Sequence, residues 1–330
     1  MRLINDYEGA TPILTRVQQV PGQPVEQVFK DVRRAVLEQS RGQQTPWDTS
    51  SLVSDFVFAK APEERALTPA ETEELQLWRS VEATRDPVQL MLFLRGYGDS
   101  GKPQGMAAYS FREMGADMVA LMQHLGFARF DLVGHDRGGR TAHRMALDHP
   151  DAVASLTVMD IVPTQTILDA LTTPVARAYY HWLFLAQPAP FPETMIGHDP
   201  DAYFESCLLG WGAAQLSDFG QAQLQAYRRA WRDPQAIAAM CNDYRAAIDV
   251  DLALDRADLG RQVHCPSLVL YGAQGAMAQA YDVAATWAPR LADMRAAGIT
   301  GGHFFPDQSP DETAQALLAF LANSGGPTRA

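Results

Sequence analysis

The chain has 330 residues, of which 47% are hydrophobic and 20% are charged, and its formal net charge is −12 at pH 7. This is ordinary globular composition, long enough for one large domain or two small ones. An acidic chain repels nucleic acid and anionic membranes, so we expect neither as a partner. A small anionic substrate would be repelled at long range too, so its site must supply local positive charge.

The cysteines and the apolar segments indicate where in the cell the protein is expected. Cys207, Cys241 and Cys265 are widely separated and form no CxxC pair, which indicates neither a zinc site nor a disulfide framework. No apolar run reaches the roughly 18 residues of a membrane span, and the first residues lack the apolar core of a signal peptide. We therefore expect a soluble, cytoplasmic protein.

The chain changes character near Arg95. Residues 1–95 contain no histidine and no cysteine, and helical signals dominate them. One such signal is a capping box with proline at the first helical position, Thr68-Pro69-Ala70-Glu71. From Gly96 onward, strands alternate with helices, a pattern typical of an α/β fold with a parallel sheet.

The α/β part begins with a glycine-rich turn, RGYGDSGKP. Periodicity and capping signals predict helices at about 110–125, from the turn at 134–138 to about 149, and at 311–321, with strands at 130–133, 155–159 and 267–272. The segment 165–250, between two of these strands, is rich in Trp, Tyr, Phe and Pro. We expect it to form a helical lid over the carboxyl ends of the strands, where such folds bind ligands.

The segment Gly134-His135-Asp136-Arg137-Gly138 follows an apolar strand and opens a helix, which is the context of a nucleophile elbow. The glycines allow a sharp turn that exposes Asp136 at the helix N-terminus, where free N–H groups stabilise its charge. A plain helix cap would also explain an aspartate here. As a nucleophile, a carboxylate attacks an sp3 carbon and forms an alkyl ester that water then hydrolyses. Such chemistry is typical of dehalogenases and epoxide hydrolases and differs from that of esterases.

Two further residues follow in the order that a catalytic triad requires. Asp160 ends a later strand, and His303 lies in a late glycine-rich loop. We expect Asp160 to orient His303, and His303 to activate water. A lone histidine in such a loop is more often part of a surface turn, so this prediction depends on the chain order of Asp136, Asp160 and His303.

Five segments together resemble the fluoroacetate (haloacetate) dehalogenases of the α/β-hydrolase superfamily. They are GHDRGGRTAHRMALDHPD, MDIVPT, ARAYYHWLFLAQPAPFPE, NDYRA and GGHFFPD. The resemblance runs from about Gly96 to about Leu321. It implies an α/β-hydrolase core with a helical lid, a small anionic haloacid as substrate, and neither a metal nor an organic cofactor. It leaves a homodimer open as the assembly.

The resemblance also implies roles for residues at matching positions. Asp136 resembles the nucleophile of that family, Asp160 the acid, and His303 the base. Arg137 and Arg140 resemble the pair that binds the substrate carboxylate. Their i, i+3 spacing places both side chains on one helix face beside Asp136, which suits bidentate carboxylate binding.

Three aromatic residues of the expected lid region resemble the donors that hold the departing halide: His181, Trp182 and Tyr244. An imidazole N–H, an indole N–H and a phenol O–H that converge in a dry pocket can replace the water shell of a small anion as its charge develops. Trp182 and Tyr244 could equally be ordinary aromatic residues of a lid core.

The first part of the chain resembles a different family. Pro21 to Phe58 is similar to the C-terminal end of a bacterial caspase-like peptidase domain, and Glu74 to Arg95 to the helical segment that often follows it. The family's catalytic His and Cys are absent, so peptidase activity is not expected. We expect three parts: a caspase-like remnant over 1–60, a helical linker over 61–95 and the hydrolase over 96–330. The first strands and the HG-type loop of the hydrolase family have no counterpart in this sequence.

Three functions remain open at this point. The first is a haloacetate dehalogenase that forms a 2-hydroxy acid such as glycolate and a halide. The second is an epoxide hydrolase with the same nucleophile, which would need two lid tyrosines and has no use for Arg137 and Arg140. The third is a catalytically impaired, truncated fusion whose residues 1–95 serve only as an interaction segment.

Overall fold

The computed structural model describes Arg34 and the ranges 94–98, 100–210, 214–322 and 328–329. The expected caspase-like remnant (1–60) and helical linker (61–95) therefore lie outside the described residues, except for Arg34, Leu94 and Arg95.

A mainly parallel sheet forms the centre of the described part. Its strands are β1 (Phe127–His135), β2 (Val153–Met159), β3 (Ser267–Gly272), β4 (Met294–Ile299) and β5 (Thr328–Arg329). Their spatial order is β4-β3-β2-β1-β5. Neighbouring strands from β1 to β4 run parallel, and β5 pairs antiparallel with the start of β1. The predicted α/β fold with a parallel sheet is confirmed.

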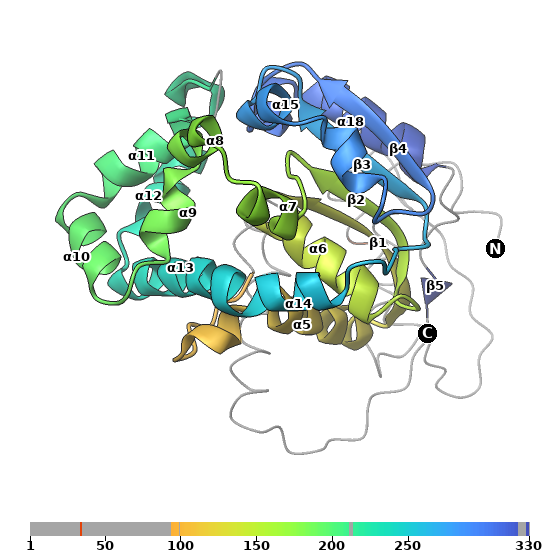
Figure 1. Ribbon diagram of the computed structural model, residues 1–330, viewed down its shortest axis with the longest axis horizontal. Helices are drawn as coiled ribbons and strands as arrows, with labels where there is room; N and C mark the ends of the chain where they lie inside the picture. Colours follow the sequence, from red (N-terminus) through yellow and green to blue (C-terminus); the bar gives the residue numbers. More distant parts are fainter. Residues whose placement is uncertain (1–33, 35–93, 99, 211–213, 323–327, 330) are drawn as a thin grey trace. The chain divides into compact units, whose positions relative to one another are not determined.

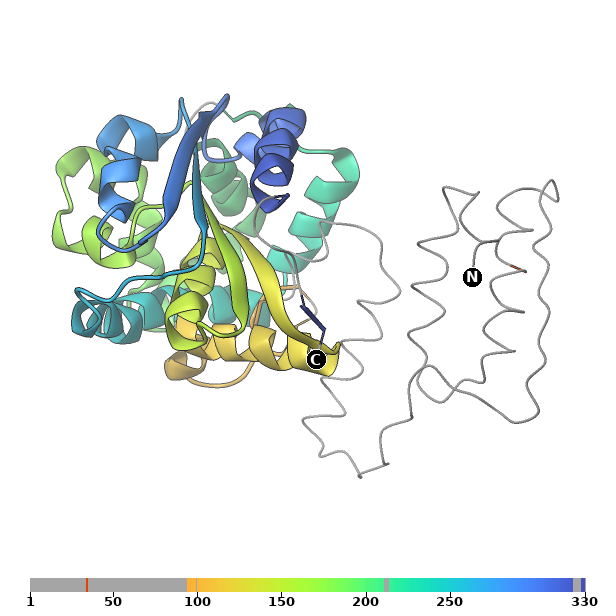
Figure 2. The same cartoon turned by 90° about the vertical axis from the view of Figure 1, so that its right-hand side faces the viewer.

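Helices lie on both faces of this sheet (Figure 2). The longest of those beside the strands are α5 (Phe111–His124), α6 (Arg137–Asp148) and α18 (Pro310–Leu321), and the shorter ones are η2 (Met106–Tyr109), α15 (Ala276–Ala280), α16 (Val283–Trp287) and α17 (Phe305–Gln308). Ser110 caps α5 by accepting a hydrogen bond from the backbone N–H of Glu113. The helices predicted at about 110–125, after the turn at 134–138 and at 311–321 are all present.

Alternate residues of the central strands face opposite sides of the sheet. Leu156 of β2 and Val269 of β3 belong to the core on one side. Leu268 and Leu270 of β3 pack on the other side with Phe320 of α18. Because both faces are covered, β2 is buried along its whole length and β3 at all but one residue, which is typical of a parallel sheet between helical layers.

Strand β4 has no counterpart among the strands predicted from the sequence. Its residues, MRAAGI, include two alanines and a glycine, which have low strand propensity, and only the last of the six is buried. Pairing with the buried strand β3, from Ser267 opposite Met294 to Gly272 opposite Ile299, holds it in place.

The edge of the sheet at β1 is only partly covered. β5 pairs with Phe127 and Arg129, and Val133, further along β1, keeps 41% of its surface exposed. No strand other than β2 and β5 pairs with β1 in the described part of the chain. The additional strands and the HG-type loop that the family resemblance implies are therefore not among the described residues.

The segment between β2 and β3 is helical, and Figure 1 places α8 to α13 together at one side of the sheet. Its elements are α7 (Thr164–Asp169), α8 (Thr173–Ala178), α9 (Tyr180–Leu185), α10 (Phe191–His198), α11 (Pro200–Gly210), η3 (Leu216–Asp218), α12 (Gln221–Trp231), α13 (Pro234–Ala246), the π-helical turn η4 (Ala247–Asp251) and α14 (Leu252–Ala257). None of the described helices is long and apolar enough to cross a membrane.

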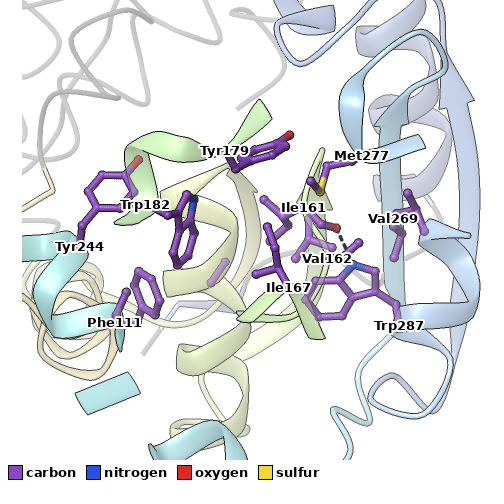
Figure 3. Close-up of a cluster of buried hydrophobic side chains, with 14 of the residues drawn as sticks. Phe111, Ile161, Val162, Ile167, Tyr179, Trp182, Tyr244, Val269, Met277 and Trp287 are labelled. Carbon is purple, nitrogen blue, oxygen red and sulfur yellow. Dashed lines mark hydrogen bonds between the residues drawn. The ribbon is translucent and has the colours of Figure 1, made fainter. Parts of the chain in front are cut away.

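One continuous core joins the sheet to this helical segment (Figure 3). On the sheet side, the indole N–H of the buried Trp287 donates a hydrogen bond to the carbonyl oxygen of Ile161 at 2.8 Å. On the side of the helical segment, the rings of Trp182 and Tyr244 meet at 90° with their centroids 5.4 Å apart. Because both groups of residues belong to one buried cluster, the helical segment packs against the sheet.

Candidate active site

Asp136 lies at the turn between β1 and α6 in a strained backbone conformation. Its φ is 48° and its ψ is −117°, a region that residues other than glycine rarely adopt. The turn is tight because Gly134 has no side chain: a Cβ there would lie 2.4 Å from the carbonyl oxygen of Gly138. The turn therefore has the geometry of the predicted nucleophile elbow.

Replacing Gly134 by alanine is expected to destabilise the fold strongly. The new methyl group would meet backbone atoms of Gly138 and Gly139, which cannot move like a flexible side chain. We expect the free energy of unfolding to fall by about 1–3 kcal/mol or more, as overpacked cores show. Gly138→Ala is the matched control, because a Cβ at Gly138 meets nothing within 4 Å. Thermal unfolding of both variants measures the difference, and equal melting temperatures would contradict the steric account.

The carboxylate of Asp136 does not cap the helix that it precedes. Asp136 occupies the cap position of α6, yet its side chain makes no capping hydrogen bond. The interpretation of this residue as a plain helix cap is therefore wrong.

Burial and neighbouring charges act on Asp136 in opposite directions. Burial favours the neutral acid and would raise the pKa of Asp136, but His303, Arg140, His135 and Arg137 together lower the pKa below its ordinary value of 3.8. The carboxylate is therefore ionised at neutral pH, as a carboxylate nucleophile must be.

His303 and Asp160 form a buried pair beside the elbow. Nδ1 of His303 donates a hydrogen bond to Oδ2 of Asp160 at 2.8 Å, and the backbone N–H of Gly272 donates to Oδ1 at 2.9 Å. In this tautomer Nε2 of His303 carries the lone pair. Burial disfavours the imidazolium, but the hydrogen bond and charge of Asp160, with the charge of Asp136, raise the pKa of His303 above its ordinary value.

His135 has a role that the sequence interpretation missed. Its ring packs on that of His303 with the centroids 4.7 Å apart, and its Nε2–H donates to the backbone carbonyl of His303 at 2.8 Å. Burial lowers the pKa of His135 to about 4, so the ring is neutral at neutral pH. His135 therefore fixes the loop of His303 without adding charge. Its place in the elbow motif, directly before Asp136, was the available signal.

Arg137 and Arg140 lie against the same aromatic ring, as their i, i+3 spacing predicts. Their guanidinium carbons are 5.1 and 4.7 Å from the centroid of Trp182. In each residue one nitrogen, Nη1 of Arg137 and Nε of Arg140, is buried and has no hydrogen-bond partner among the described residues. Leaving donors of a buried cation unpaired is costly, which indicates that an anionic ligand completes their hydrogen bonding.

The remaining donors of the two arginines are held by different partners. Nε of Arg137 donates to the carboxylate of Asp243 at 2.9 Å, and the two residues form a buried ion pair through Nη2. Nη1 of Arg140 donates instead to neutral oxygens, the carbonyl of Val162 at 2.9 Å and the hydroxyl of Thr164 at 3.1 Å. Asp243 was not among the predicted site residues, although it stands directly before Tyr244 in the NDYRA segment.

His181, Trp182 and Tyr244 gather next to the arginines, all three buried. The centroids of the His181 and Tyr244 rings are 5.5 Å apart, and the guanidinium carbon of Arg137 lies 4.3 Å from the Tyr244 centroid. Burial lowers the pKa of His181 to about 3 and raises that of Tyr244 far above its ordinary value. Both side chains are therefore neutral hydrogen-bond donors at neutral pH.

A cavity of about 490 Å³ opens beside the elbow. The predicted site residues that line it are Asp136, Arg137 and His303. Its other walls come from α5, α6, α11, α12 and α13 and from Tyr97 and Phe304. Arg140, His181, Trp182 and Tyr244 are not among the residues that line this cavity. Each of the four contacts Arg137 or another of the four.

Known proteins resemble this chain over most of its described part. The family model for the α/β hydrolase fold matches residues 91–310. A fluoroacetate dehalogenase from Burkholderia sp is 56% identical over 234 residues, which cover 70% of this chain and 77% of that protein. A soluble epoxide hydrolase from Corynebacterium sp. (strain C12) is 26% identical over 232 residues, covering 69% of this chain and 79% of that protein. A crystal structure from Nostoc sp PCC 7120, described as an α/β hydrolase, matches with a TM-score of 0.68 and 45% identity over 70% of this chain and 80% of that one.

Proposed function

We propose that this chain, which belongs to the α/β-hydrolase fold family, hydrolyses the carbon–halogen bond of a short 2-halo acid. With fluoroacetate the products would be glycolate and fluoride. One observation carries the proposal: the ionised carboxylate of Asp136, which does not cap its helix, stands beside two buried guanidinium groups. Each of them has one nitrogen without a hydrogen-bond partner among the described residues. The similarity to the fluoroacetate dehalogenase from Burkholderia sp supports the same substrate class.

In the first step, an oxygen of Asp136 attacks the carbon that bears the halogen. The carbon–halogen bond breaks, the halide leaves with the bonding electron pair, and the substrate becomes an alkyl ester of Asp136. His181, Trp182 and Tyr244 would donate hydrogen bonds to the halide as its charge develops. Because His181 and Tyr244 are neutral, they stabilise the halide through hydrogen bonds and not through a positive charge.

In the second step, water hydrolyses the ester. Nε2 of His303 takes a proton from the water while the water oxygen adds to the carbonyl carbon of Asp136. Asp160 stabilises the imidazolium that forms. The tetrahedral intermediate then expels the 2-hydroxy acid, which receives the proton from His303. Asp136 keeps the oxygen of the water and loses its remaining proton to solvent. The attacking oxygen of Asp136 leaves in the product.

The proposed role of His303 predicts a pH profile. A base must be neutral to act, so activity should rise as the pH increases through the pKa of His303, which is raised above the ordinary value of 6.5. His135 and His181 are neutral in this range because burial lowers their pKa values to about 4 and about 3. Halide release, measured from about pH 5 to about pH 9, should show one acid limb with its midpoint above 6.5. A midpoint clearly below that value would contradict the assignment.

An epoxide hydrolase is the second candidate, because relatives of that name also match this chain. The same Asp136 could open an epoxide ring, and Tyr244 could donate to the oxygen. The two arginines argue against this function, since a neutral epoxide would leave Nη1 of Arg137 and Nε of Arg140 unpaired.

Parallel assays on the purified full-length chain decide between these functions. We expect release of fluoride from fluoroacetate and of chloride from chloroacetate, and no opening of a simple epoxide. Asp136→Ala is the control for release that does not depend on the nucleophile. A chain that unfolds cooperatively yet releases no halide from either acid would contradict the proposal and favour the impaired fusion.

A further inference from the structure

A buried carboxylate holds Arg137 along one edge of its guanidinium group. The Asp243 side chain is fully buried, and its carboxylate accepts hydrogen bonds from Nε and Nη2 of Arg137. The backbone carbonyl of Asp243 also accepts from Nη2, at 2.9 Å. The hydroxyl of Tyr97 donates to Oδ2 of Asp243 at 2.6 Å, so the carboxylate is itself held from a second side. The paired edge and the second hydrogen bond of Nη2 together prevent the guanidinium group from turning.

Aromatic rings restrict the same guanidinium group further. Its carbon lies 4.6 Å from the centroid of Phe111 and 4.3 Å from that of Tyr244. Nε and Nη2 are occupied, so Nη1 is the nitrogen of Arg137 that can meet a ligand. Arg137 therefore presents one amino group, Nη1, in one fixed direction.

The charges of the two arginines are balanced differently. The charge of Arg137 is offset by the carboxylate to which it is hydrogen-bonded, Asp243. Arg140 is hydrogen-bonded only to neutral oxygens in the described structure. The positive charge that remains for an anionic ligand near Asp136 therefore comes mainly from Arg140.

From this geometry we infer that Asp243 is a positioning residue for Arg137. Because Asp243 holds Arg137 and offsets its charge, the two arginines have different tasks. Arg137, held by Asp243 and Tyr97, orients the substrate carboxylate so that the reacting carbon faces Asp136. Arg140 supplies the charge that selects a carboxylate. The inference rests on the proposed function, in which the substrate has a carboxylate. It adds Asp243 and Tyr97 to the site as residues that position Arg137.

Asp243→Asn tests the orienting task. An amide has one acceptor oxygen, so it could accept from Nε or from Nη2 but not from both, and its NH2 group would face the other N–H donor. Arg137 should therefore turn. We expect kcat for chloroacetate to fall about 10²-fold, the effect of a misplaced substrate, with KM within about fivefold of the wild-type value. The preference for chloroacetate over chloroacetamide should persist, because Arg140 is intact. Tyr97→Phe should act in the same direction but only about 3- to 10-fold, because it removes one hydrogen bond.

Two matched controls separate positioning from a general loss of packing. Asp148→Asn removes a carboxylate from another buried arginine of α6, Arg144, away from the cavity. Tyr109→Phe removes a buried hydroxyl that donates to the carbonyl of Pro103 at 2.8 Å. Both controls should leave kcat and KM per folded molecule unchanged.

An NMR readout keeps this test independent of turnover. The Nε–H signal of Arg137, identified by its absence in Arg137→Lys, should exchange slowly with water in the wild type. It should exchange faster in Asp243→Asn and, to a smaller degree, in Tyr97→Phe. If Asp243→Asn does not fold, Tyr97→Phe alone tests the inference. If these changes occur but the wild type releases no halide, the proposed function fails and the positioning role stands. Unchanged exchange, or a kcat of Asp243→Asn within about threefold of an active wild type, would overturn the inference.

Discussion

The variant His303→Asn is expected to stop turnover after the first chemical step, so that the alkyl ester accumulates on Asp136. Attack by Asp136 does not require the base, whereas hydrolysis of the ester does. General-base catalysis contributes about 10²- to 10⁴-fold, so kcat should fall by about that factor. Mass spectrometry of the variant, mixed with chloroacetate, should show one carboxymethyl group, and peptide mapping should place it on Asp136.

The double variant Asp136→Ala/His303→Asn is the control for this experiment, because it lacks the nucleophile and should take up no carboxymethyl group. A carboxymethyl group on another residue of the single variant would contradict the assignment of Asp136. An unmodified His303→Asn variant that still turns over at the wild-type rate would contradict the assignment of His303.

The variant Arg140→Gln is expected to lose most of the preference for a charged substrate. Removing one partner of a desolvated charge pair costs about 2–5 kcal/mol, which corresponds to about 30- to 4,000-fold in kcat/KM for chloroacetate. Glutamine can still bond to Val162 or Thr164, so the packing loss is limited. Arg140→Lys should recover only part of the activity, since a point charge cannot reproduce the planar fork.

The uncharged amide of the same acid provides the comparison for Arg140. Activity on chloroacetamide should change little in Arg140→Gln, because that substrate has no charge to bind. The measurement is the ratio of kcat/KM for the two substrates in the wild type and in both variants. An equal loss on acid and amide would show that Arg140 acts through the fold and not through its charge.

The parts of this site that lie in short motifs could be predicted from the sequence. The elbow, Asp160 and His303 each stand next to a strand or turn with a clear local signal, and all three are adjacent in the structure. The resemblance to dehalogenases is confirmed by a relative with 56% identity. Whether Asp136 caps its helix or serves another purpose could not be predicted, because both uses place an aspartate at the same position.

Contacts between distant parts of the chain could not be predicted from the sequence. Asp243 is 106 positions from Arg137, and tertiary packing brings the two together. Strand β4 was missed for a related reason: its own residues favour a strand weakly, and pairing with β3 stabilises it. The roles expected for 1–60 and 61–95 stay predictions, since almost all of those residues lie outside the described ranges.

A single turnover in water enriched in 18O tests the central claim, that Asp136 attacks the substrate carbon. With enzyme in excess over chloroacetate, the account predicts glycolate without 18O in its hydroxyl group, because that oxygen comes from Asp136. The label should appear instead in the Asp136 carboxylate, and glycolate from a second turnover should carry it. Labelled glycolate in the first turnover would mean that water attacks the carbon directly, and it would contradict the covalent mechanism.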